Sequence, residues 1–287
     1  MILAVACVTA LPAVLAGAPK LPPLTSDSGS PRLPGKFVWA DLVTDNVGAV
    51  LPFYSEMFKW DFRNYGGYLI AFRDDRPLAG VFQRTRPADS DAKPRWFGYI
   101  SVPDVTQAAR AATQAGGRVV VEPAKQSKRG EQAVLTDPEG ALVGVIKSSA
   151  GDPEDFQAEP GEWVWVQLLS RDARQAGEFY RAVAGYDLVE NSQPGRLSDF
   201  VLTSRGYARA TVRTIPADKP DVKPNWLPFV RVTTIGESLA KAKQLGGRVL
   251  VEPRPEALDG KVAVVADPAG AAVGIMEWSP GLLKGER

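Results

Sequence analysis

The sequence contains no histidine and a single cysteine, Cys7, among its 287 residues. Without histidine, the usual Ser-His-Asp and Cys-His nucleophilic sites cannot be built, and the imidazole ligands common at divalent metals are missing. Lys and Arg (34) nearly balance Asp and Glu (33), and the densest basic stretch, Lys125 to Arg129, is interpreted as a solvated loop. The net charge of +1 therefore predicts neither nucleic acid nor an anionic membrane surface as a partner.

Residues 1–18, MILAVACVTALPAVLAGA, form an apolar run that ends in Ala16-Gly17-Ala18. This ending has the form at which signal peptidase cleaves, so we expect an exported protein, periplasmic or envelope-tethered if the source is bacterial. A second interpretation takes Ala4 to Cys7 as a poor lipoprotein box, with a lipid on Cys7 as the one attachment to a membrane. A third is a buried helix. Residues 19–35 are rich in Pro and Ser, which predicts a tether that packs in no core.

Beyond residue 35 the chain repeats itself. The segment 94–123, which starts PRW and ends GGRVVVEP, matches 224–253, which starts PNW and ends GGRVLVEP. TDPEG at 136–140 matches ADPAG at 266–270 with the same offset, and Phe53-Tyr54 matches Phe179-Tyr180 further upstream. The repeat is too long for a solenoid unit. It predicts duplicated domains at 36–147 and 162–278, joined by a linker at 148–161 and followed by a tail at 279–287.

Each predicted domain contains two copies of a β-α-β-β-β unit, so the expected fold class is α+β. Residues 36–43 alternate as a strand should, and Asp45-Asn46 are candidate N-cap residues for a helix that ends at Phe58. Gly116-Gly117 is typical of a helix C-terminus, and Asp137 to Gly140 of a β-turn.

The FY pair, the GG-R-V strand entry and the DP-x-G turn resemble the vicinal oxygen chelate superfamily, which includes glyoxalase I, extradiol dioxygenases and bleomycin-resistance proteins. The resemblance extends from Phe37 to Glu277 and occurs twice. It implies two tandem domains, each with paired βαβββ units that form an open, curved mixed sheet around a cavity. The enzymes of this superfamily bind a divalent metal in that cavity.

The resemblance places four metal-ligand positions in each domain. In this chain they are occupied by Trp39, Gly80, Phe97 and Gly144, and by Trp165, Ala210, Leu227 and Gly274. None of these side chains can bind a metal. We therefore expect that the metal site is lost and that the protein has no cofactor, with an all-oxygen site at another place as the alternative.

Strand alternation predicts which side chains line the two cavities. The expected ligand-binding residues are Trp39, Asp41, Phe82, Phe97 and Tyr99 in the first domain and Trp165, Gln167 and Phe229 in the second, with Val212 and Met276 beside them. Gly80 and Gly144 predict empty volume, unless Trp39 and its counterpart fill the space. For Asp41 two roles are open: a hydrogen bond to Tyr99 or to an arginine such as Arg95, or orientation of a ligand or general-base catalysis.

These observations favour an exported binding protein, monomeric or weakly dimeric, that holds a small aromatic or amphipathic molecule without a metal. The alternative is an enzyme, a lyase, isomerase or dioxygenase-like protein, that uses a non-standard metal site or metal-free acid–base catalysis by Asp41 and Tyr99. A scaffold with both cavities filled is a third possibility. If chemistry survives, we expect it in the first domain.

Overall fold

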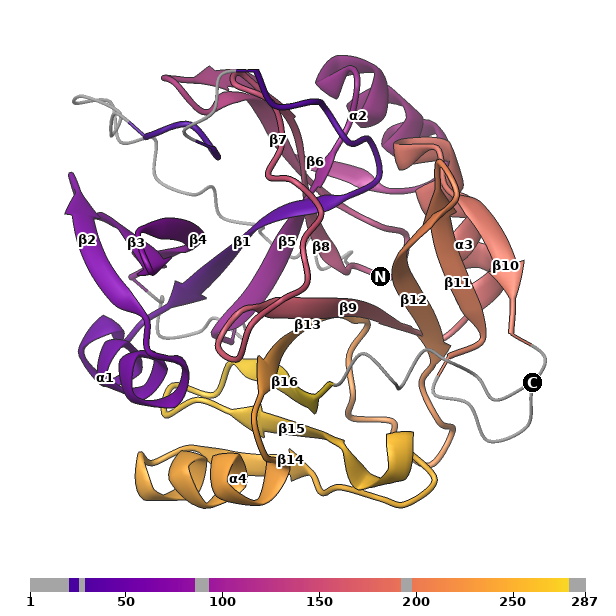
Figure 1. Ribbon diagram of the computed structural model, residues 1–287. Helices are drawn as coiled ribbons and strands as arrows, with labels where there is room; N and C mark the ends of the chain where they lie inside the picture. Colours follow the sequence, from indigo (N-terminus) through magenta and orange to yellow (C-terminus); the bar gives the residue numbers. More distant parts are fainter. Residues whose placement is uncertain (1–20, 26–28, 86–92, 192–197, 279–287) are drawn as a thin grey trace, which may run out of the picture.

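The computed structural model describes residues 21–25, 29–85, 93–191 and 198–278 (Figure 1). The predicted leader, including Cys7, and the predicted tail lie outside the described residues. Within them, no helix is both long enough and apolar enough to cross a membrane.

The first domain is one eight-stranded mixed sheet with two helices on one of its faces. Its elements are β1 (Phe37–Thr44), α1 (Val47–Phe58), β2 (Asp61–Tyr65), β3 (Tyr68–Arg73), β4 (Arg76–Gln83), β5 (Arg95–Ser101), α2 (Val105–Gln114), β6 (Arg118–Gln126), β7 (Gly130–Thr136) and β8 (Leu142–Ser148). The strand order is β2-β3-β4-β1-β5-β8-β7-β6. The two βαβββ units meet where β1 pairs antiparallel with β5, and within each unit the first strand pairs parallel with the last.

The second domain repeats this plan with the order β10-β11-β12-β9-β13-β16-β15-β14. Its elements are β9 (Trp163–Ser170), α3 (Ala173–Ala184), β10 (Asp187–Glu190), β11 (Phe200–Ser204), β12 (Tyr207–Thr214), β13 (Asn225–Val232), α4 (Ile235–Gln244), β14 (Arg248–Val251), the short 3-10 helix η1 (Leu258–Gly260), β15 (Val262–Ala266) and β16 (Ala272–Glu277). The predicted α+β class and tandem arrangement are thereby confirmed.

The helices begin and end where the sequence indicated. The Asn46 side chain accepts a hydrogen bond from the Ala49 N–H (3.1 Å) and caps α1, and Asp104 caps α2 in the same way. Gly116 follows α2 with φ +88°, a conformation that favours glycine.

Helices from both domains pack between the two sheets, so the domains share their cores. One apolar cluster joins α2 and β8 to α3 and β12, and a second joins α1 and β4 to α4 and β16. In Figure 1, α2 accordingly lies beside α3, and α1 lies above α4. Phe179 packs against Gly117 and Phe53 against Gly247, so the FY pair of each domain contacts the GG pair of the other.

The repeated motifs also form two matching hydrogen-bond chains between the domains. Trp96 Nε1 donates to the Tyr54 hydroxyl (2.7 Å), which donates to Asp267 Oδ2 (2.9 Å) in the turn of the other domain. The second chain runs from Trp226 to Tyr180 (2.8 Å) and on to Asp137 (3.3 Å). We call these six residues the two interdomain relays.

Part of the predicted tether packs against the folded domains. Leu21 and Leu24 are only 7% and 2% exposed, and Asp152 in the linker accepts a hydrogen bond from the Leu33 N–H (2.6 Å). The expectation that 19–35 packs in no core is wrong for these residues, because its two leucines cover an apolar face of the first sheet.

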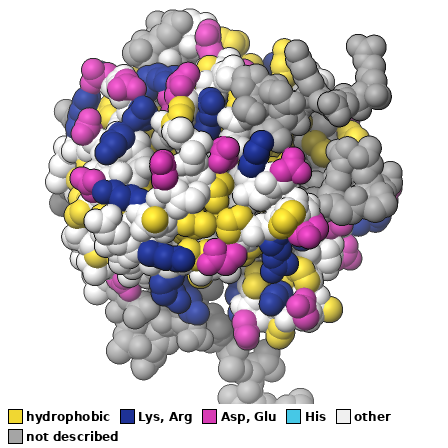
Figure 2. Space-filling view, turned by 60° about the horizontal axis from the view of Figure 1, so that its bottom comes forward, with side chains coloured by type: hydrophobic (Ala, Val, Ile, Leu, Met, Phe, Trp, Pro, Cys, Tyr) yellow, Lys and Arg dark blue, Asp and Glu magenta, His cyan; other side chains and the backbone are white. Residues whose placement is uncertain are grey.

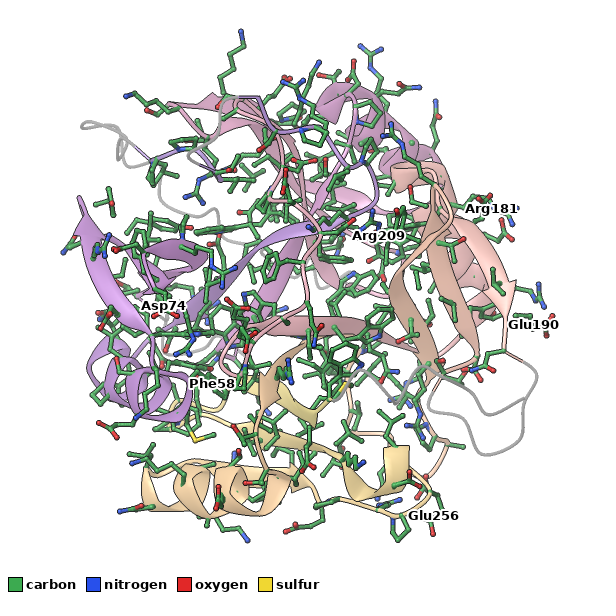
Figure 3. All side chains as sticks on the ribbon, in the orientation of Figure 1. Phe58, Asp74, Arg181, Glu190, Arg209 and Glu256 are labelled. Atoms are coloured by element: carbon green, nitrogen blue, oxygen red, sulfur yellow. The ribbon has the colours of Figure 1, made fainter. Side chains whose placement is uncertain are left out.

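Charged groups from three parts of the chain meet at the linker. Asp155 pairs with Arg209 (2.7 Å) and Lys36 (3.0 Å), and Figure 3 shows Arg209 near the middle of the molecule. On the face drawn in Figure 2, Lys and Arg side chains are interspersed with Asp and Glu, and apolar side chains gather near the middle.

Candidate functional site

The helix-free face of the first sheet brings together the residues that the sequence predicted for the first cavity. Strand register places Asp41 opposite Gly80 on β4 and Phe97 on β5, and Tyr99 opposite both Trp39 and Gly144. The aromatic members form one cluster with neighbouring side chains, among them Tyr68, Ile70, Phe72 and Ile146, and Phe82 packs half-buried at its margin. We call this cluster, with Asp41, the first helix-free face.

The two glycines on this face do not leave empty volume. A Cβ atom added to Gly80 would lie within 3.0 Å of the Tyr68 hydroxyl and of Asp41 Oδ1, and one added to Gly144 within 3.0 Å of the Tyr99 ring. The prediction of open space at these positions is therefore wrong. Glycine is needed there because large side chains from adjacent strands lie across its backbone.

Asp41 is the centre of a buried hydrogen-bond network. Its Oδ1 accepts from the Tyr68 hydroxyl (2.5 Å) and from Trp39 Nε1 (2.9 Å). Among the described residues, the hydrogen-bond partners of Asp41 are thus Tyr68 and Trp39, and not the expected Tyr99 or Arg95. Burial raises the pKa of Asp41, and the hydrogen bond from Tyr68 and the charge of Arg129 oppose this only in part. Burial and the Asp41 charge likewise hold the pKa of the Tyr68 and Tyr99 hydroxyls well above its usual value.

Arg129 is the cation beside this network. Its guanidinium lies 4.0 Å from the centre of the Trp39 ring, its Nη1 donates to the Tyr68 hydroxyl (3.4 Å) and its Nε donates to the Pro22 carbonyl (3.3 Å). Two expectations are thereby corrected. Arg129 is 2% exposed and not part of a solvated loop, and it takes the place beside Asp41 that was expected for Arg95, which is exposed. Arg129 lies in the turn between β6 and β7, where its N–H donates to the Gln126 carbonyl (2.8 Å), and Gly130 (φ +124°) follows it.

The second sheet has a corresponding face with a more open environment. Trp165 Nε1 donates to Thr211 Oγ1 (3.0 Å), and Gln167 Nε2 donates to the same oxygen (3.3 Å). Phe229 lies opposite Trp165 in the strand pairing, Leu227 lies opposite Gln167, and Met276 packs against both apolar side chains. Trp165 and Gln167 are half-buried, whereas their first-domain counterparts Trp39 and Asp41 are buried. We call this set the second helix-free face.

One part of the predicted second site is wrong by a single residue. Thr211, not Ala210, pairs with Gln167, and both Ala210 and Val212 point into the core shared with α3. Gly80 and Thr211 occupy equivalent positions but differ by 131 in number, whereas the anchors Trp96 and Trp226 differ by 130. A one-residue shift in a strand moves a side chain to the opposite face, so the fixed offset missed the threonine.

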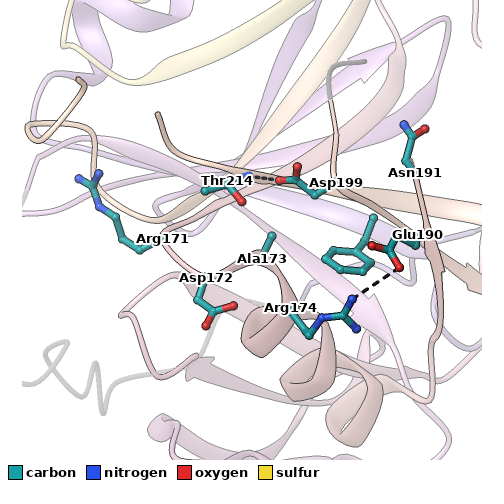
Figure 4. A pocket seen from close by; sticks show the side chains of 9 residues that line it. Arg171, Asp172, Ala173, Arg174, Glu190, Asn191, Asp199 and Thr214 are labelled. Atoms are coloured by element: carbon teal, nitrogen blue, oxygen red, sulfur yellow. Dashed lines mark hydrogen bonds and ion pairs between the residues drawn. The ribbon is translucent and has the colours of Figure 1, made fainter. Parts of the chain in front are cut away.

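Two surface hollows occur away from both faces. One, of about 590 Å³, lies between the C-terminal end of α1 and α4, near Gly161. The other, of about 380 Å³, lies at the N-terminal end of α3 (Figure 4), where Arg174 pairs with Glu190 (3.5 Å) and Asp199 accepts from the Thr214 N–H (2.5 Å). Two of the charged groups that line this second hollow, Arg174 and Glu190, thus pair with each other.

Comparisons with known proteins identify the family. The model of the glyoxalase-like domain matches residues 38–146 and again 163–276, so the chain belongs to the glyoxalase-like domain family. The protein named "Putative glyoxylase CFP32" from Mycobacterium bovis is 26% identical over 248 residues, covering 84% of this chain and 94% of that protein. The anthracycline biosynthesis protein DauV from Streptomyces sp. strain C5 is 28% identical over 260 residues, covering 85% and 94%.

Solved structures show the same fold at low sequence identity. The Mn(II)-bound glyoxalase from Novosphingobium aromaticivorans aligns with a TM-score of 0.58 at 14% identity, over 87% of this chain and 89% of that one. The 2,2',3-trihydroxybiphenyl 1,2-dioxygenase from Sphingomonas wittichii aligns with a TM-score of 0.56 at 16% identity, over 86% and 91%. The predicted membership of the vicinal oxygen chelate superfamily is confirmed.

Proposed function

We propose that this chain is a small-molecule-binding member of the glyoxalase-like family that works without a divalent metal. Its ligand is a small aromatic or amphipathic molecule held on the second helix-free face. The observation that supports this is the difference between the two faces. Trp165 and Gln167 remain half-buried where Trp39 and Asp41 are buried, so the second face has side chains that a ligand can still cover.

The side chains at the centre of both faces do not fit a divalent metal. Such a metal takes four or more nitrogen, oxygen or sulfur ligands, several of them from the protein. On the first face, the Asp41 carboxylate lies among aromatic and aliphatic side chains, and its oxygen already accepts from Tyr68 and Trp39. On the second face the central positions hold Gln167, Thr211 and Leu227. Over the described ranges, no group of three or more Asp, Glu or Cys side chains is close enough to hold a metal.

The second helix-free face has the chemistry of an aromatic-binding surface. The Trp165 indole offers a flat apolar area, and the Thr211 hydroxyl and Gln167 amide beside it are polar groups that can fix the orientation of a ligand. The relative DauV is named an anthracycline biosynthesis protein, which favours a polycyclic aromatic ligand for this chain too.

The geometry gives less support to acid–base catalysis by Asp41 and Tyr99. Both side chains are buried, at 4% and 5% exposure, and Asp41 is already hydrogen-bonded to Tyr68 and Trp39. A general base must reach the proton that it removes, directly or through one water molecule. We therefore place the functional surface in the second domain, although the sequence favoured the first.

A fluorescence titration tests the proposal. An anthracycline, and 1,2-dihydroxybenzene as a minimal aromatic, are added to the purified protein, and tryptophan emission and melting temperature are followed; a true ligand raises the melting temperature with its concentration. Trp165→Ala is expected to weaken binding at least tenfold. Tyr207→Ala, an exposed aromatic on β12 at 60% exposure, is the matched control and is expected to bind normally. Normal binding by Trp165→Ala would contradict the proposed site, and a stoichiometric divalent metal in elemental analysis would contradict metal-free function.

We also propose that the protein is exported and acts as a monomer or weak dimer. The apolar run 1–18 and its Ala-Gly-Ala ending support export. Intact-mass measurement of the secreted protein tests this: cleavage after Ala18 leaves a chain that starts at Pro19, whereas a lipidated Cys7 leaves a heavier, membrane-bound chain. A full-length mass in the cytoplasmic fraction would contradict both forms of export.

A further inference from the structure

The segment Leu21-Pro22-Pro23-Leu24 covers the first helix-free face. Leu21 and Leu24 belong to the same apolar cluster as Trp39, Tyr68 and Tyr99, and they are nearly as buried as these aromatic side chains. A segment that precedes the first strand by more than ten residues therefore lies where the sheet would otherwise present an aromatic surface.

Arg129 joins this segment to the buried network. Its guanidinium has one edge formed by Nε and Nη2, which point the same way and together match the two oxygens of a carboxylate. The Nε–H donates to the Pro22 carbonyl (3.3 Å), but Nη2 is buried without a hydrogen-bond partner. Buried donors in folded proteins are almost always paired, so this edge is only half satisfied by the segment.

The charge at Arg129 points to the same kind of partner. No ion pair joins Arg129 to a carboxylate of the described residues, and its contacts are a ring face, a tyrosine hydroxyl and a carbonyl. Asp41 is hydrogen-bonded to Tyr68 and Trp39 instead. A cation that is 2% exposed and lacks a direct counterion favours an anionic ligand.

We propose that the first helix-free face is a second ligand site, for a small aromatic carboxylate, and that residues 21–24 occupy it in place of the ligand. In this arrangement the Pro22 carbonyl occupies the position in which one carboxylate oxygen of the ligand would bind Arg129. Leu21 and Leu24 occupy the position in which the aromatic ring of the ligand would lie against Trp39. A bound carboxylate would satisfy both Nε and Nη2, which one carbonyl oxygen does not.

The attachment of the segment is suited to displacement. Pro22 and Pro23 have no backbone N–H, so this stretch cannot add to the sheet as a strand. The following residues are held more firmly: Arg32 donates to the Ser148 carbonyl (3.1 Å) and the Lys36 ammonium to the Pro153 carbonyl (2.7 Å). Residues 21–24 can therefore leave the face while the chain from Arg32 onward stays bound.

The test compares the unmodified protein with Leu21→Ser/Leu24→Ser, in which the segment loses its apolar contacts. Naphthalene-2-carboxylate is the probe, naphthalene-2-carboxamide is its uncharged analogue, and calorimetry measures both affinities. The double variant is expected to bind the carboxylate at least tenfold more tightly than the unmodified protein and to discriminate against the carboxamide. Arg129→Met in the same background is expected to lose the gain. Leu258→Ser, which alters an exposed leucine (38%), is the control and is expected to leave the affinity unchanged.

A second measurement needs no variant of the segment. Hydrogen exchange at the Leu21 and Leu24 amides of the unmodified protein is expected to accelerate when the carboxylate is added, because the ligand releases the segment. A synthetic peptide with residues 19–26 is expected to compete with the carboxylate for the double variant. Equal affinity of the variant and the unmodified protein, or exchange at residues 21–24 that does not change at saturation, would overturn the proposal. Trp165→Ala leaves this site intact, so failure here and failure of the proposed function are distinguishable.

Discussion

Removal of the Tyr54 hydroxyl should destabilise the whole chain and not the first domain alone. In Tyr54→Phe, Trp96 Nε1 loses its acceptor at 2.7 Å and Asp267 Oδ2 loses its donor at 2.9 Å, while the ring still fills its place. A buried polar group left unpaired costs about 1–3 kcal/mol, so we expect a loss of roughly 2–5 kcal/mol in the free energy of unfolding. That is a large part of the roughly 5–15 kcal/mol of an ordinary folded protein.

The second relay supplies an internal comparison. The bond from Tyr180 to Asp137 measures 3.3 Å, longer than the usual O–H···O distance of about 2.7–2.8 Å. Tyr180→Phe should therefore cost about 1 kcal/mol less than Tyr54→Phe, by the same account of lost hydrogen bonds.

Urea denaturation followed by circular dichroism measures both losses. The midpoint should fall with an unchanged slope, because the surface exposed on unfolding stays the same. Tyr207→Phe, on an exposed side chain, is the control and should stay within about 0.5 kcal/mol of the unmodified protein. A loss below about 0.5 kcal/mol for Tyr54→Phe, or a greater loss for Tyr180→Phe, would contradict the expected cost of leaving these buried groups unpaired.

Three further predictions concern the two helix-free faces. Because burial raises the pKa of Asp41, the folded chain holds the carboxyl proton more tightly than the unfolded chain does. The free energy of unfolding should therefore fall as pH rises above about 3.9, and it should fall more for the unmodified protein than for Asp41→Asn. Parallel pH profiles of the two proteins in urea titrations would contradict this. Gly144→Ala should lower the free energy of unfolding by about 1–3 kcal/mol, since the new methyl group would overlap the Tyr99 ring. Gly236→Ala is the control and should lower it little, because no atom lies within 4 Å of the added Cβ; equal melting temperatures of the two variants would contradict the overlap. Thr211→Val removes the oxygen to which both Trp165 and Gln167 donate. It should lower the free energy of unfolding by about 1–2 kcal/mol and shift the tryptophan emission. An unchanged emission spectrum and urea midpoint would be evidence against these two hydrogen bonds.

The repeat was enough to predict the domains and their class, because FY, GG-R-V and DP-x-G are local signals that each copy contains. Their role between the domains could not be predicted. The hydrogen bond from Tyr54 to Asp267 joins residues 213 positions apart, and no local pattern shows which copy of the turn faces which copy of the helix.

The candidate sites were predicted in part, for similar reasons. Strand alternation correctly placed Trp39 and Asp41 on one face, since that inference needs only the period of a single strand. Thr211 was missed because the offset between the copies changes by one residue before β13. Arg129 was missed because a stretch rich in Lys and Arg is typical of a solvated loop and does not reveal that one of its side chains is buried.

The reciprocal form of the interdomain relays has a consequence for how this molecule can change. The tyrosine of each domain donates to an aspartate of the other domain, which is the self-complementary pattern of an isologous dimer. In a true homodimer, any substitution on one helix-free face would appear on both. Fusion of the two copies in one chain removes that constraint, so Asp41 and Gln167 can differ while the contact between the copies keeps its symmetry. The helix-free face of one domain can thus become filled while that of the other stays accessible, and the contact between the two domains is not weakened.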